Sequence, residues 1–449
     1  MPAAAIDASR RPSSGFPARR IDATLRVRPS NDKNAYQAPL LQSLISVAAL
    51  LLSAAIVLGG NGLLSVLLPV RGDAEGFATL AIGLLTAAYY LGLVLGCLLA
   101  ARAIRRVGYI RAFAALAGTL TTLALVYPLV PSEPVWVLIR IPIGFCLAGV
   151  QMIIDAWVHE RAANRVRGQV YAVYMIVNQV SVALGQLSMG LADPRHFTLF
   201  AVVAMAFSLS LVPVSLTTAP APSPGGAIRP RPRLLYRISP VATVAALIAG
   251  LANGAFWGLG PLFARSVGLD VSSIAAFMSA AVVGGAVCQW PLGRVSDRLD
   301  RRKVMVACCA VGVGVSGLFA LGIGVPGVAM FALSAALGAS ITPVYALAMA
   351  HVNDHIGSGD RVMASSTVLM LYGLGAMAGP VAASLIMGPL GHRGLFVYIA
   401  AAYLFLGLFA IYRMTRRSAA PTEGRKGFEA VGPTPASAPR LGNPASELE

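Results

Sequence analysis

Arg140 stands out because it is the only Lys or Arg inside an otherwise apolar run of the sequence. A guanidinium binds carboxylates in pairs of hydrogen bonds, and it is costly in lipid, so it should face protein or a wet cavity. Gly144, Gln151 and Asp155 follow at steps that place all four on one helical face. We expect Arg140 and Gln151 to contact a solute. The alternative is that Arg140 reaches the membrane interface or ties its helix to a neighbour.

Two asparagines occupy matched positions in the two halves of the chain. Asn61-Gly62 and Asn253-Gly254 lie 192 residues apart, and each pair is followed eight residues on by a proline. Gly and Pro interruptions at matched positions of two halves are typical of transport sites, although Asn and Gly also serve helix packing. Trp257 lies one turn after Asn253, where its ring could stack on a ligand. We expect Asn61, Asn253 and Trp257 to contact the substrate.

Further polar side chains lie at helical spacing inside apolar runs. Tyr174 and Asn178 are one turn apart, and lipid would penalise such a stripe, so it should face a lumen. We include both in the predicted substrate site. Other polar or aromatic side chains of this kind are Tyr171, Gln186, Gln289, Trp290, Tyr345 and Tyr372.

The sequence gives little support for metal binding, phosphate binding or catalysis. His351-Val-Asn-Asp354-His355 has a zinc-like spacing, but it falls at the end of an apolar run, and we expect no metal site there. The sequence has no Gly-rich phosphate loop with Lys and no reactive constellation within the apolar runs. We therefore expect no cofactor and no enzymatic activity. The five cysteines lie in apolar runs and indicate no disulfide framework.

The elements that must position these residues are membrane-spanning helices. Apolar residues make up 57% of the 449 positions, charged residues 12%, and the mean hydropathy is +0.73. Runs near the ~20 residues needed to cross a bilayer must be helical, because backbone polar groups in lipid have to pair internally. The chain is thus predicted to be all-α, with twelve spans at 41–69, 78–101, 111–130, 135–158, 169–191, 197–217, 240–264, 272–292, 304–323, 327–350, 363–387 and 395–412.

The second half of the chain repeats the first. The offset is 192 residues through the Asn-Gly pairs and 194 further along, where Glu160, Arg167 and Gly185 match Asp354, Arg361 and Gly379. This predicts two pseudo-symmetric six-helix bundles with the site at the seam. We expect bundles at 39–217 and 240–414, a linker at 218–239, and disordered tails at 1–38 and 415–449.

The net charge of +17 follows membrane topology rather than nucleic-acid binding. With both termini inside, the inner loops carry seventeen Arg and Lys residues and the outer loops carry four. This bias predicts a multi-pass protein of the bacterial inner membrane with both termini cytoplasmic. The expected partners are the lipid bilayer and a small-molecule substrate, with no nucleic acid, and we expect a monomer.

The segment Gly293-Arg-Val-Ser-Asp297-Arg298-Leu-Asp300-Arg301-Arg302-Lys303 resembles the loop signature of the major facilitator superfamily. The matching first-half loop departs from it, with Arg105 in place of the acid. The run Asp155-Ala-Trp-Val-His-Glu160-Arg161 is similar to the bacterial YcaD-like branch. The resemblance implies a secondary transporter of small solutes that works by alternating access, and proton coupling is common in the superfamily. A transporter-shaped receptor or structural protein is the alternative.

The resemblance also implies a cytoplasmic gate between the two halves. In the superfamily the loop after the eighth span meets the start of the fifth, and the loop after the second meets the start of the eleventh. We therefore expect Asp297 near Arg167 and Arg105 near Asp360 when the inner side is closed, and both pairs apart when it opens. Glu160 and Asp354, which match in the repeat, complete the predicted gate residues.

Overall fold

The structure is a computed structural model that describes residues 33–161, 166–216, 230–323, 327–356 and 360–416. Most of the tails expected at 1–38 and 415–449, and much of the linker expected at 218–239, lie outside these residues. Two helices extend into the expected tails and linker: α1 begins at Lys33, and α8 occupies Pro232–Ile238.

The described residues contain helices and no strands, as the sequence predicts. Twelve stretches are long and apolar enough to cross a membrane, and each coincides with one of the twelve predicted spans. The helices are α1 (Lys33–Ala74), α2 (Thr79–Val107), α3 (Tyr109–Leu129), α4 (Glu133–Arg161), α5 (Arg167–Leu187) with η1 (Ser188–Leu191), α6 (Thr198–Leu209), α7 (Leu211–Ser215), α8 (Pro232–Ile238), α9 (Pro240–Ser266), α10 (Val271–Arg298), α11 (Arg301–Leu321), α12 (Val328–Ile341), α13 (Pro343–Asn353), α14 (Arg361–Leu390) and α15 (Gly394–Arg416).

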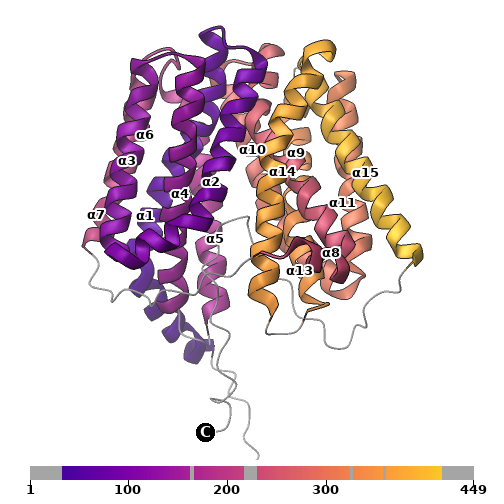
Figure 1. The fold of residues 1–449 in the computed structure, drawn as a ribbon, viewed down its shortest axis with the longest axis horizontal. Coiled ribbons are helices and arrows are strands. Elements are labelled where there is room, and N and C mark those ends of the chain that lie inside the picture. The colour runs from indigo at the N-terminus through magenta and orange to yellow at the C-terminus, as the bar shows by residue number, and fades with distance from the viewer. Residues whose placement is uncertain (1–32, 162–165, 217–229, 324–326, 357–359, 417–449) are drawn as a thin grey trace, which may run out of the picture.

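The helices form two bundles that stand side by side, α1 to α7 in indigo to magenta and α9 to α15 in pink through orange to yellow (Figure 1). Matched glycines bring matched helices together in both. A Cβ at Gly144 of α4 would overlap the Tyr89 carbonyl oxygen of α2, and a Cβ at Gly338 of α12 would overlap the Ala281 carbonyl oxygen of α10. Small residues let helix backbones approach this closely. The repeat seen in sequence is therefore a repeat of helix contacts.

A second pair of matched glycines joins the helices that carry the asparagines to their neighbours. A Cβ at Gly185 of α5 would overlap the Gly59 carbonyl of α1, and one at Gly379 of α14 would overlap the Leu251 carbonyl of α9. Gly375, one turn before Gly379, lies equally close to the Leu247 carbonyl. These contacts hold α1 against α5 and α9 against α14.

Proline interrupts the tenth span next to the seam between the halves. Pro343 has no backbone N–H to donate and follows Thr342, where α12 ends and α13 begins. The carbonyl of Ile341 is left to accept from side chains, Asn253 of α9 at 3.3 Å and Tyr403 of α15 at 3.3 Å. The break thus draws α9 and α15 to the same point.

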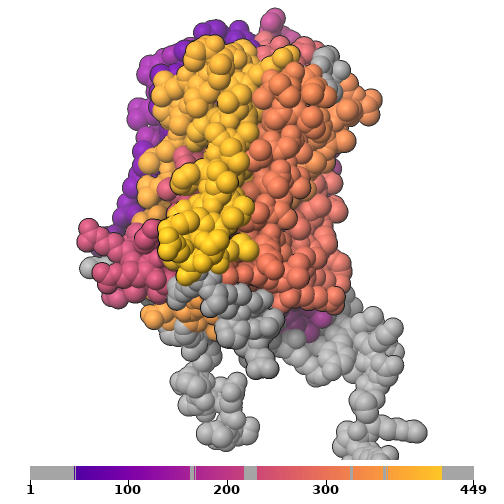
Figure 2. Space-filling model, turned by 90° about the vertical axis from the view of Figure 1, so that its right-hand side faces the viewer, coloured from indigo at the N-terminus to yellow at the C-terminus, as the bar shows by residue number. Residues whose placement is uncertain are grey.

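The outer faces of the bundles are apolar, as a bilayer requires. Figure 2 shows one of them, on which yellow α15 lies beside α11. Leu404, Phe405, Leu408 and Ile411 of α15 are exposed on the molecular surface, as is Val311 of α11. Side chains of this kind are stable against lipid tails and would be costly in water.

Candidate functional site: a cavity between the two halves

A cavity of about 250 Å³ lies at the seam, where both halves contribute side chains. Helices α1, α2, α4 and α5 line it from the first half, and α9, α10, α14 and the α12–α13 break line it from the second. The lining residues are Asn61, Ser65, Leu68, Pro69, Leu85, Thr86, Tyr89, Tyr90, Arg140, Gln179, Val182, Gln186, Asn253, Trp257, Val282, Thr342, Tyr345 and Tyr372. A concave site of mixed apolar and polar lining is the usual form of a small-molecule site.

Arg140 supplies the only charge among the described residues that line this cavity. Its side chain is 6% exposed, and neither Nε nor Nη1 has a hydrogen-bond partner in the described part of the chain. Its guanidinium carbon lies 4.7 Å from the ring centre of Tyr89, within range of a cation–π contact. Leaving buried N–H groups of a charged side chain unpaired is costly. The Tyr89 ring thus packs against the guanidinium, and the N–H groups on Nε and Nη1 remain available to bind a ligand.

The two matched asparagines both reach the cavity but are bonded differently. Asn253 donates from Nδ2 to the carbonyls of Ala249 (2.8 Å) and Ile341 (3.3 Å), and its Oδ1 accepts from Trp257 Nε1 (3.2 Å). Asn61 Oδ1 is buried without a hydrogen-bond partner among the described residues. Asn253 therefore ties the broken tenth span to α9 and orients Trp257, whereas the Asn61 oxygen is left to accept from a ligand.

Aromatic side chains form much of the remaining lining. Tyr345 and Tyr372 pack edge to face, with ring centres 5.1 Å apart, and Tyr89 and Tyr90 pack in the same way at 5.2 Å. The sequence singled out Tyr345 and Tyr372 as polar residues of apolar runs, and the same signal was present for the adjacent Tyr89 and Tyr90, which the prediction missed. Gln179 and Thr342 are further lining residues that it did not name.

Three residues predicted for the substrate site are not among those that line the cavity: Gln151, Tyr174 and Asn178. Tyr174 and Asn178 are buried, and both interact electrostatically within a cluster that includes Asp155 of α4. Helical spacing predicts that they share one face of a helix but not which neighbour that face meets. On α5 it is instead the face with Gln179, Val182 and Gln186 that meets the cavity, whereas Tyr174 and Asn178 belong to the cluster with α4.

The two halves contact each other through polar side chains at the end of the molecule where α1 and α9 terminate. We call this the opposite end, because it lies away from the end that carries α8 and the linker between the halves. Arg265 Nε of α9 pairs with Asp73 Oδ2 of α1 at 2.8 Å, and its Nη1 donates to the Val70 carbonyl at 2.8 Å. Ser279 of α10 donates to the Ala183 carbonyl of α5 at 3.0 Å. Polar contacts thus join the two halves on this side of the cavity.

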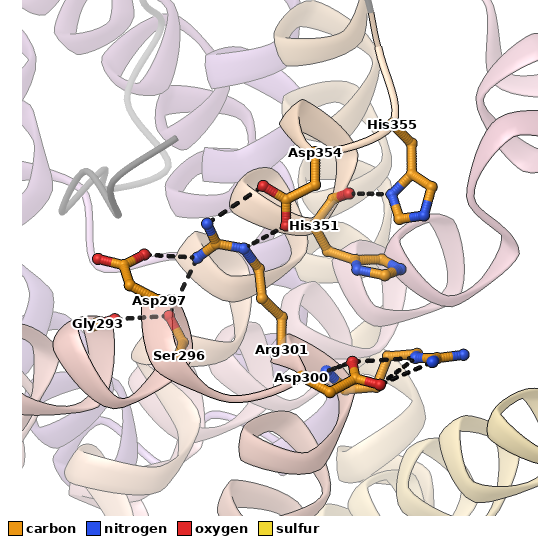
Figure 3. A network of polar contacts seen from close by, with 9 residues as sticks. Gly293, Ser296, Asp297, Asp300, Arg301, His351, Asp354 and His355 are labelled. Carbon is orange, nitrogen blue, oxygen red and sulfur yellow. Dashed lines mark hydrogen bonds and ion pairs between the residues drawn. The ribbon is translucent and has the colours of Figure 1, made fainter. Parts of the chain in front are cut away.

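At the other end, where α8 and the start of α11 lie, a buried ion network joins helices of the second half (Figure 3). We call this the linker end. Arg301 donates to both Asp354 oxygens, at 2.6 and 3.3 Å, and to Asp297 and Ser296 at 3.2 and 3.1 Å. The side chains of Arg301 and Asp354 are 1% and 3% exposed. Asp300 begins α11 and pairs with Arg302 at 2.7 Å. The network binds α10, α11 and α13 into one unit.

The structure describes the side chains of all the predicted gate residues except Arg167. Arg105, Asp360 and Glu160 are exposed, and the described residues show no ion pair from Arg105 to Asp360. The side chain of Arg167 lies outside the described residues, so its approach to Asp297 stays a prediction. Within its own half, Asp297 pairs with Arg301 at 3.2 Å. At the repeat position of Arg301 the first half has Tyr109, which packs against Trp157 with ring centres 5.6 Å apart, so the network has no counterpart there.

The His351 to His355 segment lies within α13 and the turn after it. His355 Nδ1 is 2.8 Å from the His351 carbonyl oxygen, and Asp354 is engaged by Arg301. Across the described residues, no three His, Cys, Asp or Glu side chains are placed to hold a metal ion.

Comparison with known proteins agrees with this architecture. The family model of the Major Facilitator Superfamily matches the chain twice, over residues 50–242 and 242–444, once for each half. An uncharacterized MFS-type transporter of Yersinia pestis is 26% identical over 83% of this chain and 95% of its own length. The uncharacterized MFS-type transporter YcaD of Escherichia fergusonii is 24% identical over 86% of this chain and 98% of its own length.

Among solved structures, the nucleoside transporter NupG superposes with a TM-score of 0.70 at 13% identity, covering 83% of this chain and 100% of that one. At this identity the likeness concerns the fold. The double family match covers more than half of the chain, and the relatives are transporters rather than enzymes. The chain is an integral membrane transporter that belongs to the major facilitator superfamily.

Proposed function

We propose that this protein is a secondary active transporter that carries a small organic anion across the bacterial inner membrane by alternating access. The observation that carries the proposal is Arg140: a buried guanidinium with two N–H-bearing nitrogens unpaired, in a cavity between the two halves. Charge-assisted hydrogen bonds to a carboxylate would satisfy these donors.

The rest of the lining supports a substrate with an apolar or aromatic body. Tyr89, Tyr90, Trp257, Tyr345 and Tyr372 surround the cavity, while its described lining contains no acidic side chain. A cationic substrate would meet Arg140 with no carboxylate to offset the repulsion. The unpaired oxygen of Asn61 offers an acceptor for a hydroxyl or amide of the same substrate.

The orientation in the membrane follows from the basic loops. We propose that the linker end and both termini face the cytoplasm, since inner loops carry the excess of Arg and Lys. The contacts of Arg265 and Ser279 then seal the periplasmic side, and the present conformation is open inward. On this basis an open gate accounts for the lack of an ion pair between Arg105 and Asp360 among the described residues. We also propose that residues 39–217 and 240–414 form the two bundles, that residues 218–239 link them, and that the protein is a monomer.

A thermal-shift experiment with matched ligands tests the proposal. Pairs of aromatic and aliphatic carboxylates and their uncharged amides are added to purified protein, since a ligand that binds the folded state raises its melting temperature. We expect carboxylates alone to stabilise the wild type, and Arg140→Gln to abolish the shift without lowering the melting temperature of the free protein. Equal shifts for acids and amides, or an unchanged shift in Arg140→Gln, would remove the anion assignment.

A receptor without transport is the second candidate. It would bind the same carboxylate and give the same thermal shift. The two differ in flux: a transporter loaded into vesicles exchanges labelled for unlabelled ligand across the bilayer, and a receptor does not.

A further inference from the structure

A short basic helix, α8, lies on the surface at the linker end of the second half, where Figure 2 shows it in pink at the foot of the bundle. A surface pocket there is lined by Arg231, Pro232, Arg233, Leu234 and Arg237. In the described part of the chain, none of the three arginines forms an ion pair with an acidic side chain. We propose that they bind the phosphate of an anionic phospholipid at the membrane surface. Lipid binding of this kind is independent of which solute the cavity takes.

The side chains of α8 divide between an inward and an outward face. Leu235 is fully buried against the bundle, and Ile238 is half-buried. Arg233, Tyr236 and Arg237 are exposed, and helical spacing places them on the side of the helix opposite Leu235. The bundle thus holds α8 by its apolar side, and the two arginines and the tyrosine project away from the protein.

Other exposed aromatic side chains at the linker end mark the level of the membrane surface. On α10 the guanidinium carbon of Arg294 lies 3.6 Å from the ring centre of Trp290, which is 62% exposed. On α15 the guanidinium carbon of Arg416 lies 5.6 Å from the ring centre of Tyr412, which is 52% exposed. Exposed Trp and Tyr side chains gather where lipid headgroups meet the hydrocarbon. The outer face of α8 repeats this combination of an exposed aromatic ring and a neighbouring arginine, which places the helix at the level of the headgroups.

Charge and shape favour an anionic phospholipid over other anions. Arg233 and Arg237 are one turn apart on α8, so both guanidinium groups can approach the same phosphate. Each guanidinium presents a planar fork of donors that matches two phosphate oxygens. A zwitterionic lipid would bring a cationic headgroup to these arginines, whereas phosphatidylglycerol carries no charge besides its phosphate. A soluble phosphate would leave the exposed ring of Tyr236 in water, whereas a lipid surrounds it.

The start of α8 is tied to α14. The backbone N–H of Arg231 donates to Thr367 Oγ1 at 2.9 Å, and the Thr367 hydroxyl donates to the Met363 carbonyl at 2.7 Å. α14 begins directly after Asp360, a predicted gate residue, and carries Tyr372 of the cavity lining. A lipid bound to α8 would therefore restrain the first turns of α14, between the predicted gate and the cavity.

The test measures lipid binding at α8 itself. Tyr236→Cys, in a full-length chain whose five native cysteines are changed to alanine, is labelled with bimane and reconstituted into nanodiscs. Quenching of the label by brominated phosphatidylglycerol is compared with quenching by brominated phosphatidylcholine at equal ionic strength. We expect phosphatidylglycerol to be preferred at least about tenfold, since each arginine near an anionic surface contributes about fivefold. Arg233→Gln combined with Arg237→Gln should reduce this preference at least about fivefold.

A matched control removes two exposed arginines at the linker end of the first half. Arg102→Gln combined with Arg111→Gln makes the same change of charge away from α8, and it should leave the preference for phosphatidylglycerol unchanged. Equal quenching by the two lipids with the α8 arginines present, or an unchanged preference after both are replaced, overturns the proposal. Displacement of phosphatidylglycerol by inorganic phosphate at matched ionic strength would assign the arginines to a soluble anion, which also overturns it.

Hydrogen exchange tests the link from α8 to α14. Backbone amides of residues 361–370 in the wild type should exchange more slowly in phosphatidylglycerol nanodiscs than in phosphatidylcholine nanodiscs. The two lipids should give equal exchange when Arg233 and Arg237 are both replaced by Gln, because the lipid then no longer holds α8. Equal exchange in the two lipids for the wild type would overturn the restraint on α14.

Discussion

The two matched asparagines should differ in what they contribute to stability, because only one of them is bonded. Asn253→Ala removes a donor to Ile341 and the acceptor of Trp257 Nε1. The Ile341 carbonyl keeps the Tyr403 hydroxyl, so the main loss is the indole partner and one interhelical bond. Interhelical hydrogen bonds in membrane proteins average ~0.6 kcal/mol, and a buried donor left unpaired costs about 1–3 kcal/mol. We expect a loss of about 1–3 kcal/mol for Asn253→Ala.

The matched change Asn61→Ala removes an oxygen that has no partner in the described structure, so its cost should stay within about 0.5 kcal/mol. With roughly 2–4 °C of melting temperature per kcal/mol for domains of moderate size, Asn253→Ala should melt at least about 1 °C below Asn61→Ala. Differential scanning fluorimetry in one detergent measures both variants.

A double-mutant cycle identifies the bond responsible. In a Trp257→Phe background the indole N–H is absent, so Asn253→Ala should cost less than in the wild type by about 0.5–1.5 kcal/mol. Asn61→Ala melting as low as Asn253→Ala, or an additive cycle with Trp257→Phe, would refute this assignment of the two asparagines.

Three further outcomes are expected. Arg301→Ala leaves Asp354 buried and unpaired, which should destabilise the protein by about 3–5 kcal/mol. Asp297→Asn changes a carboxylate that is one-third exposed and should cost under about 1 kcal/mol. Chemical or thermal unfolding in detergent compares the two variants, and equal costs would contradict the network. Gly144→Ala should prevent the approach of α4 to α2 and reduce folded yield on size-exclusion chromatography, while Gly118→Ala, which meets no atom within 4 Å, should behave as wild type. Cysteines at positions 105 and 360 should crosslink when the linker end is closed and not when it is open; equal crosslinking in both states would reject the Arg105–Asp360 gate pair.

The membrane spans were predictable because lipid imposes a strong constraint on composition. Hydrophobic runs located all twelve stretches, and the repeat identified the two bundles. Arg140, Asn61, Asn253 and Trp257 could be assigned to the seam because a polar residue in an apolar run has few stable surroundings. These inferences depend on local sequence and on a matched second half.

The remaining features depend on contacts that spacing does not encode. Tyr174 and Asn178 belong to the α4–α5 cluster because of how α5 is rotated about its axis, and a polar stripe alone does not fix that rotation. The partner of Arg301 is Asp354, which lies 53 residues away in sequence, and no spacing pattern connects the two. The bonding of Asn253 required the break before Pro343, which frees the Ile341 carbonyl.

The central claim is that Arg140 holds the anionic group of a transported solute. The most direct measurement is counterflow in proteoliposomes, with the carboxylate identified by thermal shift loaded inside and its labelled form supplied outside. Wild-type protein should accumulate label transiently, Arg140→Lys should do so with an apparent affinity at least about tenfold weaker because it lacks the planar fork, and Arg140→Gln should give no accumulation while remaining folded in the vesicles. Counterflow by Arg140→Gln at the wild-type rate and affinity would contradict the account.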